Sequence, residues 1–280
     1  MEFGVLGPLK AHMNAISIVP TAGKPRQILS LLAVRAGGVV HVETLMAEVW
    51  GNAIPRSAST TLQTYILQLR KKLTEAGVRQ TGRSAKEVLS TSYGGYRLAP
   101  DEFSLDLLEF QRLVRLGGTA LTGNDPGGAA THLRRALALW RGPALADVPV
   151  GEVLGTEVIG MQEARSLALE LRLEADLRLG RHAEIIGELR MLVNREPLNE
   201  TLAAQLMTAL YRAGHTWRAL GVFQSLRQSL IEELGVEPTP RVQRLHQAIL
   251  ANDTELDVWP GASPTAPSTP LRHFPRSLSA

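Results

Sequence analysis

The stretch STTLQTYILQLRKKL, residues 59–73, carries the pattern that decides the fold of the first part of the chain. At about 100° per residue, its apolar side chains fall on one side of a helix and form a stripe. The stripe consists of Leu62, Ile66, Leu69 and Leu73. The opposite side carries Thr60, Thr64, Leu67, Gln68 and Lys71, and the first acid to follow is Glu75. The stretch therefore predicts an amphipathic helix whose second face is polar and basic.

That second face is unusual for a helix that meets only water. Solvent-facing helices more often place Glu and Lys four residues apart. Short amide and hydroxyl side chains followed by a basic cluster instead suit the edges of bases flanked by phosphates. The stretch alone leaves two interpretations open, a helix that reads DNA and a solvated helix with a basic end.

The segments around this helix predict its fold. MEFGVLGPLKAHMNAISIVP (1–20) mixes β-forming residues with Gly and Pro in short runs, which predicts a small antiparallel sheet. KPRQILSLLAVRAGGVV (24–40) and HVETLMAEVWG (41–51) predict two helices that end at glycine. EVLSTSYGGYRLAP (87–100) predicts a hairpin. This order is that of a winged helix-turn-helix, in which residues 59–73 form the reading helix and the hairpin forms the wing.

The predicted wing has two kinds of side chain. We expect Tyr96 and Leu98 to pack inward, while Tyr93 and Arg97 are exposed and lie close to a DNA backbone. A plain ribbon that only closes the sheet is the alternative.

Beyond Pro100 the strand signals stop, and helical periodicity runs to about Leu250. LRLGRHAEIIGELRML (177–192) and YRAGHTWRALGVFQSL (211–226) align at an offset of 34 residues, with Gly180 on Gly214. This is the period of tetratricopeptide-like helix pairs, although a general helical bundle is an alternative. PGASPTAPSTP (260–270) contains too few apolar residues to order itself.

The resulting prediction is a mainly α protein, with an α+β winged helix-turn-helix before an all-α tetratricopeptide-like part. The predicted domains are 1–99, 100–251 and a Pro/Ser-rich tail, 252–280. Residues 1–98 contain 12 Lys/Arg against 5 Asp/Glu, whereas residues 99–250 contain 16 against 19. A basic first third on a mildly acidic body is expected when one module meets a polyanion and the other meets a different partner.

The sequence lacks the motifs that mark several common classes of enzyme and metal-binding protein. There is no cysteine, and the seven histidines form no metal-spaced pair. The Gly-Lys at Gly23 lacks the remaining residues of a phosphate loop, and no nucleophile elbow or clustered carboxylates occur. No apolar run approaches the ~20 residues that span a bilayer. We therefore expect a cytoplasmic protein that is no enzyme, uses no cofactor or metal and does not bind a membrane. A tetratricopeptide-like adaptor remains the second hypothesis and an enzyme the third.

Residues 1 to about 250 resemble the SARP family, the Streptomyces antibiotic regulatory proteins. The first part resembles the OmpR-type winged helix-turn-helix in KPRQILSLLAVRAGGVV, LMAEVWG, TLQTYILQLRKKL and GGYRL. The second resembles the bacterial transcriptional activation domain in HLRRALALWRGPALADVP, LRLGRHAEIIGELRMLV, QLMTALYRAGHTWRAL and EELGVEPTPRVQRLHQAIL. The resemblance implies a transcription activator of secondary-metabolite genes. It would bind double-stranded DNA at direct repeats near the −35 element as a head-to-tail dimer and recruit RNA polymerase with its sigma factor.

The resemblance also implies DNA-facing residues on the reading helix: Thr61, Thr64, Tyr65, Gln68, Arg70 and Lys71. For Thr64, Gln68 and Lys71 the helical pattern independently predicts exposure, and Thr60 lies on the same face. Gln68 is the first candidate for a base contact, because a primary amide can pair with adenine through two hydrogen bonds. The predicted phosphate ligands are Arg56, Arg70, Lys71 and Lys72.

Two further predictions concern the wing and the turn before the reading helix. Related wings often carry an arginine just before their turn, whereas this chain has Ser92 and Tyr93 there, which argues against minor-groove reading by that route. Arg97 is predicted to meet phosphate or to stabilise the hairpin. On the turn from Gly51, Asn52 and Arg56 are the candidates for a polymerase contact, with helix capping or phosphate binding as the alternative.

Overall fold

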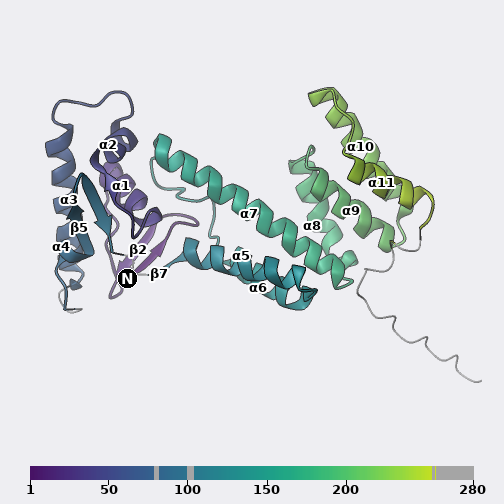
Figure 1. Cartoon of the computed structure of the whole chain (residues 1–280), viewed down its shortest axis with the longest axis horizontal. Helices are drawn as coiled ribbons and strands as arrows, with labels where there is room; N and C mark the ends of the chain where they lie inside the picture. Colours follow the sequence, from purple (N-terminus) through teal and green to yellow (C-terminus); the bar gives the residue numbers. More distant parts are fainter. Residues whose placement is uncertain (79–81, 100–103, 254–255, 257–280) are drawn as a thin grey trace, which may run out of the picture. The chain divides into compact units, whose positions relative to one another are not determined.

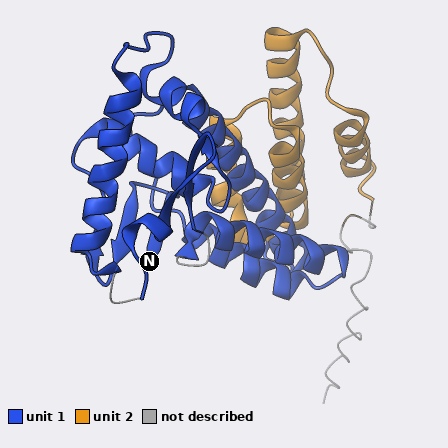
Figure 2. Cartoon of the chain, turned by 60° about the vertical axis from the view of Figure 1, so that its left-hand side comes forward, with its two compact units in different colours: residues 1–181 blue, residues 182–280 orange. Residues whose placement is uncertain are grey.

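The computed structural model describes residues 1–78, 82–99, 104–253 and 256, which form two compact units, 1–181 and 182–280 (Figure 2). The elements of the first unit are β1 (Glu2–Gly4), β2 (Lys10–Met13), β3 (Ile16–Ser17), α1 (Gly23–Val34), β4 (Val40–His41), α2 (Val42–Trp50), α3 (Ala58–Glu75), α4 (Ala85–Val88), β5 (Leu89–Ser92), β6 (Gly95–Leu98), β7 (Ser104–Leu105), α5 (Asp106–Thr122), α6 (Pro126–Ala138) and α7 (Glu152–Arg178) (Figure 1). The second unit contains α8 (His182–Arg195), α9 (Glu200–Arg212), α10 (Thr216–Leu234) and α11 (Pro240–Leu250).

The strands form two small sheets. In the first, with order β3-β2-β1-β7, β1 pairs antiparallel with β2, placing Phe3 opposite Ala11, and parallel with β7, placing Glu2 opposite Ser104. In the second, with order β4-β6-β5, the hairpin β5–β6 pairs through β6 with β4. The hairpin needs glycine at position 95, because a Cβ there would lie 2.3 Å from the carbonyl oxygen of Val40.

The three helices α1, α2 and α3 share an apolar core with these sheets. The four apolar residues predicted for the inner face of α3 are at most 3% exposed, because they pack against side chains of α1 and the sheets. Tyr96 and Leu98 are buried in β6, as predicted. Strands, three helices and a terminal hairpin follow one another in the predicted order, which confirms the winged helix-turn-helix.

Helix α7 extends over 27 residues and packs against α5 and α6 as well as against α1 and α2 (Figure 1). The winged helix-turn-helix and the first three helices after it therefore form one compact unit. Strand β7 corrects the expectation that strands stop at Pro100: it has two residues, too few for a periodic pattern. Its pairing depends on main-chain groups, for example Ser104 N–H donating to the Met1 oxygen at 3.0 Å.

Alternate helices of the remaining chain end in the same turn. After α5, α7, α9 and α11, a residue with positive φ is followed by one whose N–H donates to the carbonyl five residues earlier, as in a Schellman motif. The residues with positive φ are Asn124, Gly180, Gly214 and Asn252. The predicted alignment of Gly180 with Gly214 is therefore confirmed. The structure adds two turns that the sequence comparison missed.

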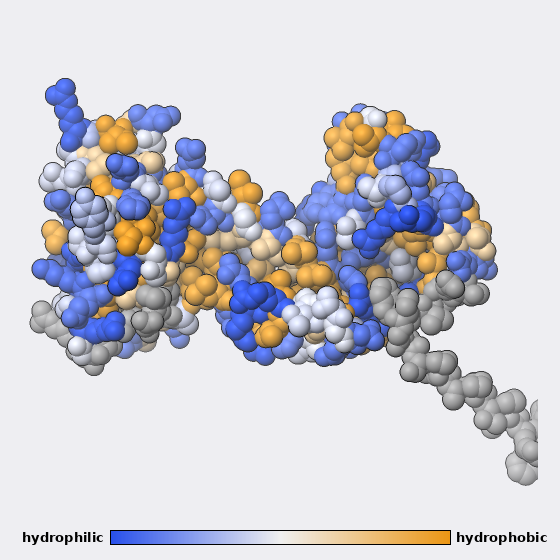
Figure 3. All heavy atoms as spheres, viewed as in Figure 1, coloured by the Kyte–Doolittle hydropathy of each residue, from blue (hydrophilic) through white to orange (hydrophobic). Residues whose placement is uncertain are grey.

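The mainly α fold class is confirmed. The division into 1–99 and 100–251 remains a prediction about function. Most of the predicted tail, 252–280, lies outside the described residues. Large apolar side chains of both units are exposed, including Ile159, Leu167, Trp217 and Leu234. On the face drawn in Figure 3, hydrophobic residues lie among hydrophilic ones. Within the described part of the chain, no helix has the length and apolarity needed to cross a membrane.

Candidate DNA interface

The outer face of α3 is the centre of the candidate interface. Thr60, Thr64, Leu67, Gln68 and Lys71 are all exposed, as the helical pattern predicts. No acid lies on α3 before Glu75, the last residue of the helix. From Thr60 to Lys71 the helix therefore presents an acid-free, mostly polar surface about three turns long.

The threonines of α3 are ordered by their own helix. Thr61 Oγ1 donates to the Ser57 oxygen at 2.9 Å, and Thr64 Oγ1 donates to the Thr60 oxygen at 3.1 Å. Each hydroxyl thereby uses its proton and keeps its lone pairs as acceptors. Thr64 is exposed, so its oxygen can accept from a base and its methyl group can contact thymine. Thr61 is only half-exposed, at the side of the helix.

Tyr65 lies at the edge of this face and contacts α2. Its ring stacks on Trp50 at a centroid distance of 6.4 Å and an angle of 18°. Lys24 also packs on Trp50, with its Nζ 5.2 Å from the centroid of the indole ring. The sequence did not single out Lys24, because its partner Trp50 is 26 positions away in another helix. These contacts fix the end of α2, from which the turn to α3 begins.

Arg70 has partners inside the chain that the sequence did not predict. Its Nε and Nη2 donate to the Leu89 oxygen at 3.0 and 2.8 Å, and Nη2 also donates to Thr91 Oγ1 at 2.9 Å. Burial lowers the pKa of the Arg70 guanidinium below its usual value. Arg70 therefore holds strand β5 of the wing against α3. Its assignment as a phosphate ligand stays a prediction.

The lysines at the end of α3 are more accessible. Lys71 Nζ lies 3.7 Å from Glu75 Oε1, and both side chains are more than half exposed, so this pair is weak and can exchange partners. Lys72 is half-exposed. Together with Gln68, these residues line a hollow of about 240 Å³ that is also lined by Pro20, Thr21, Ala22 and Pro25.

The remaining predicted residues lie on the turns beside α3. Tyr93, at the tip of the wing, is fully exposed, and Arg97 is exposed on β6. Asn52 and Arg56 are exposed on the turn between α2 and α3. Neither residue is the cap of a helix there, because α2 ends at Gly51 and α3 begins after Ser57. The capping alternative for this turn is therefore wrong.

A buried carboxylate connects the winged helices to α7. Glu48, on α2, is 2% exposed and accepts from Gly151 N–H at 2.6 Å, Leu154 N–H at 2.9 Å and Gln27 Nε2 at 2.7 Å. It thus caps the N-terminus of α7, whose first N–H groups have no partner within the helix. A Cβ at Gly151 would lie 2.2 Å from the main-chain carbonyl oxygen of Glu48, so the close approach requires glycine. No pattern in the sequence predicts this contact.

Comparisons with known proteins agree with this architecture. A family model described as "Bacterial transcriptional activator domain" matches residues 105–250, and one described as "Transcriptional regulatory protein, C terminal" matches residues 18–98. In structure, the chain is similar to Mycobacterium tuberculosis EmbR, solved with a low-affinity phosphopeptide. The TM-score is 0.83 at 31% identity, over 90% of this chain and 65% of that one.

Curated relatives include regulators from Streptomyces. "Regulatory protein DnrI" of Streptomyces peucetius is 48% identical over 97% of this chain and 100% of the relative. "Regulatory protein AfsR" of Streptomyces coelicolor is 36% identical over 97% of this chain and 26% of the relative. "Transcriptional regulator RedD" of Streptomyces coelicolor is 36% identical over 92% of this chain and 73% of the relative. The chain therefore belongs to the Streptomyces antibiotic regulatory proteins, a family of transcription regulators with an OmpR-type domain followed by a bacterial transcriptional activator domain.

Proposed function

We propose that the chain is a sequence-specific DNA-binding activator of secondary-metabolite genes, in which α3 enters the major groove. The observation that carries this proposal is the exposed, acid-free face of α3, flanked by a wing and by basic side chains. A face of this kind combines groups that pair with bases and groups that neutralise phosphates. The surplus of positive charge in residues 1–98 adds long-range attraction to a polyanion.

The proposed contacts divide into two classes. Gln68 and Thr64 lie in the middle of the exposed face and meet base edges. Phosphates are met by residues around it: Arg56, Thr60, Thr61, Tyr65, Arg70, Lys71, Lys72, Tyr93 and Arg97. Within this second class, Arg70 also acts indirectly, because its bonds to Leu89 and Thr91 position the wing.

Gln68→Ala and Lys71→Ala are expected to weaken DNA binding in different ways. Removing the amide should cost about 1–3 kcal/mol of binding free energy at one base position, because a base edge loses its partner. Removing the ammonium should weaken binding to all sequences alike and reduce the slope of log K against log salt by about one. A binding panel of single-base operator variants at several salt concentrations measures both effects. Equal losses across the panel for Gln68→Ala would contradict base reading.

The proposed operator is a direct repeat near the −35 element, bound by two copies head to tail about one helical turn (~10–11 bp) apart. Copies in one orientation present the same turn, residues 51–56, toward the same end of the DNA. The copy nearer the promoter would then place this turn beside RNA polymerase holoenzyme and its sigma factor. A footprint with two half-sites in the same orientation supports this arrangement, and a palindromic footprint rules it out.

Asn52→Ala should separate polymerase contact from DNA binding. Asn52 is exposed and caps neither neighbouring helix, so its loss should not change the fold. We expect nearly unchanged DNA affinity and a several-fold decrease in transcription in a reconstituted system. Arg56 on the same turn is the second candidate, but its charge also affects phosphate binding. A decrease in transcription that only follows a loss of DNA affinity would refute the polymerase role of Asn52.

A further inference from the structure

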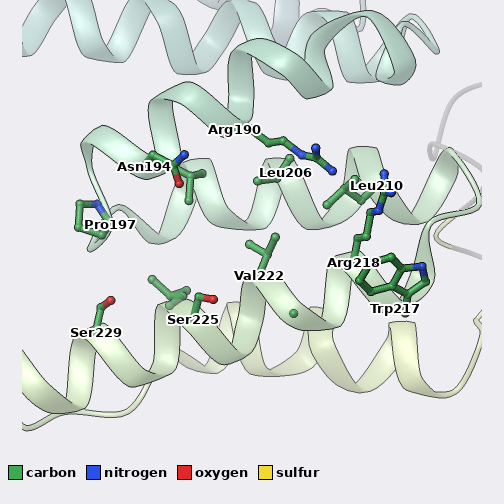
Figure 4. A pocket seen from close by; sticks show the side chains of 13 residues that line it. Arg190, Asn194, Pro197, Leu206, Leu210, Trp217, Arg218, Val222, Ser225 and Ser229 are labelled. Carbon is green, nitrogen blue, oxygen red and sulfur yellow. The ribbon is translucent and has the colours of Figure 1, made fainter.

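The second unit contains an open groove of about 650 Å³ between α8, α9 and α10 (Figure 4). Its floor is apolar and consists of Leu206 and Leu210 from α9 and Leu226 from α10, which are at most 3% exposed. Along α10 the groove runs from Trp217 to Ser229, a length of roughly 18 Å at 1.5 Å per residue. This length corresponds to about three turns of a second helix.

One end of the groove is cationic and aromatic. Arg190 from α8 and Arg218 from α10 lie on the same side as Trp217, whereas Ser225 and Ser229 lie toward the other end (Figure 4). Trp217 is 71% exposed, and the Arg218 guanidinium lies 5.1 Å from its ring centroid.

These two arginines differ from others in the same unit. Arg195 and Arg227 form ion pairs with Glu196 and Glu237. For Arg190 and Arg218, the described residues provide no carboxylate within 4.0 Å. The groove therefore offers two guanidinium groups beside an exposed indole, an arrangement that attracts carboxylates of a partner.

The side of the groove formed by α10 carries small side chains. Gly221, Ser225 and Ser229 follow one another at four-residue spacing and therefore lie on one face of the helix. A Cβ at Gly221 would meet no atom of the described residues within 4 Å, so packing among them does not require glycine there. Glycine within a helix costs about 0.5–1 kcal/mol relative to alanine. Its presence at this position leaves room for the main chain of a bound segment.

From this geometry we propose that the groove binds an acidic amphipathic helix of a partner protein. The apolar face of the helix lies on Leu206, Leu210 and Leu226, and its carboxylates face Arg190 and Arg218. This is the helix-in-groove mode of recognition, in which the apolar face gives affinity and the charged edge fixes the orientation. The groove belongs to the second unit, whereas α3 belongs to the first.

The test is a displayed library of amphipathic helices, each about 16 residues long, half with acidic and half with basic residues on the polar face. The wild-type chain should enrich acidic members. Enriched peptides should bind about tenfold more weakly to Arg190→Glu and Arg218→Glu, because the charge complementarity is reversed. Arg244→Glu, on the exposed side of α11, is the matched control and should bind as the wild type does.

Gly221→Leu provides a second test that does not change charge. The added side chain should extend into the groove and abolish peptide binding, while a melting temperature at least equal to that of the wild type shows that the fold is intact. Gly187→Leu is the control, because a Cβ at this helical glycine also meets nothing within 4 Å and the residue does not line the groove. Enrichment of basic helices, of no helices, or equal binding to Gly221→Leu would overturn the proposal. So would a dimer that Gly221→Leu dissociates, since the occupant would then be a second copy.

Discussion

Replacing Asp176 with asparagine is expected to lower the free energy of unfolding by about 3–5 kcal/mol. The Asp176 side chain is fully buried near the end of α7 and accepts from Arg134 at 2.5 Å, Arg181 at 3.1 Å and Arg172 at 3.3 Å. Arg134 and Arg181 are partly exposed and can turn toward water. The Arg172 side chain is only 9% exposed, so its charge would lose a buried counter-charge without gaining solvent.

Urea denaturation followed by circular dichroism measures this loss. Glu163→Gln is the matched control, because Glu163 lies on the same helix and is exposed, and its replacement should change stability by less than about 0.5 kcal/mol. If Asp176→Asn is as stable as the control, the buried cluster contributes little and its arginines are already solvated.

Replacing Glu48 with alanine is expected to cost about 2–4 kcal/mol. Two main-chain N–H groups at the start of α7, those of Gly151 and the completely buried Leu154, lose their acceptor at once. Gln27 Nε2 loses one of two acceptors, because it also donates to the main-chain oxygen of Glu48 at 2.7 Å. Glu48→Gln should cost less than alanine, because the amide oxygen can still accept from one N–H while its NH₂ group faces the other donors.

Hydrogen exchange distinguishes this local effect from a general loss of stability. We expect the amides of Gly151 and Leu154 to exchange faster in Glu48→Ala, even under conditions in which the whole chain stays folded. Glu43→Ala, an exposed carboxylate on the same helix, is the control for the loss of charge. Unchanged exchange at both amides would show that α7 begins without help from Glu48.

The sequence predicted the elements whose pattern is local. The inner and outer faces of α3 follow from its own spacing of leucines and polar residues, and α2 ends at Gly51 because a glycine stops it. Contacts that depend on main-chain acceptors or donors left no such pattern. Arg70 donates to the carbonyl oxygen of Leu89, and Glu48 accepts from the N–H of Gly151. Because both partners use main-chain groups, their side chains do not predict these contacts.

The repeat shows the same limit in another form. Gly180 and Gly214 share a residue type and lie 34 positions apart, so alignment finds them. The equivalent turns at Asn124 and Asn252 use asparagine, which also tolerates positive φ. Their spacings differ because the helices between the turns, as well as the connections, differ in length. A comparison of residue types therefore misses two turns that the main-chain geometry shows to be equivalent.

Strand β7 has a consequence for how the N-terminal sheet is completed. Strand β1 can pair with β2 as soon as the first residues are made, but its other edge is covered only when Ser104 and Leu105 arrive, about a hundred positions later. Until then, and in any fragment that stops at the end of the wing, β1 offers unpaired main-chain groups to other chains. Open edges of this kind promote association between sheets. By pairing with β1, Ser104 and Leu105 should therefore protect the winged helix-turn-helix from self-association.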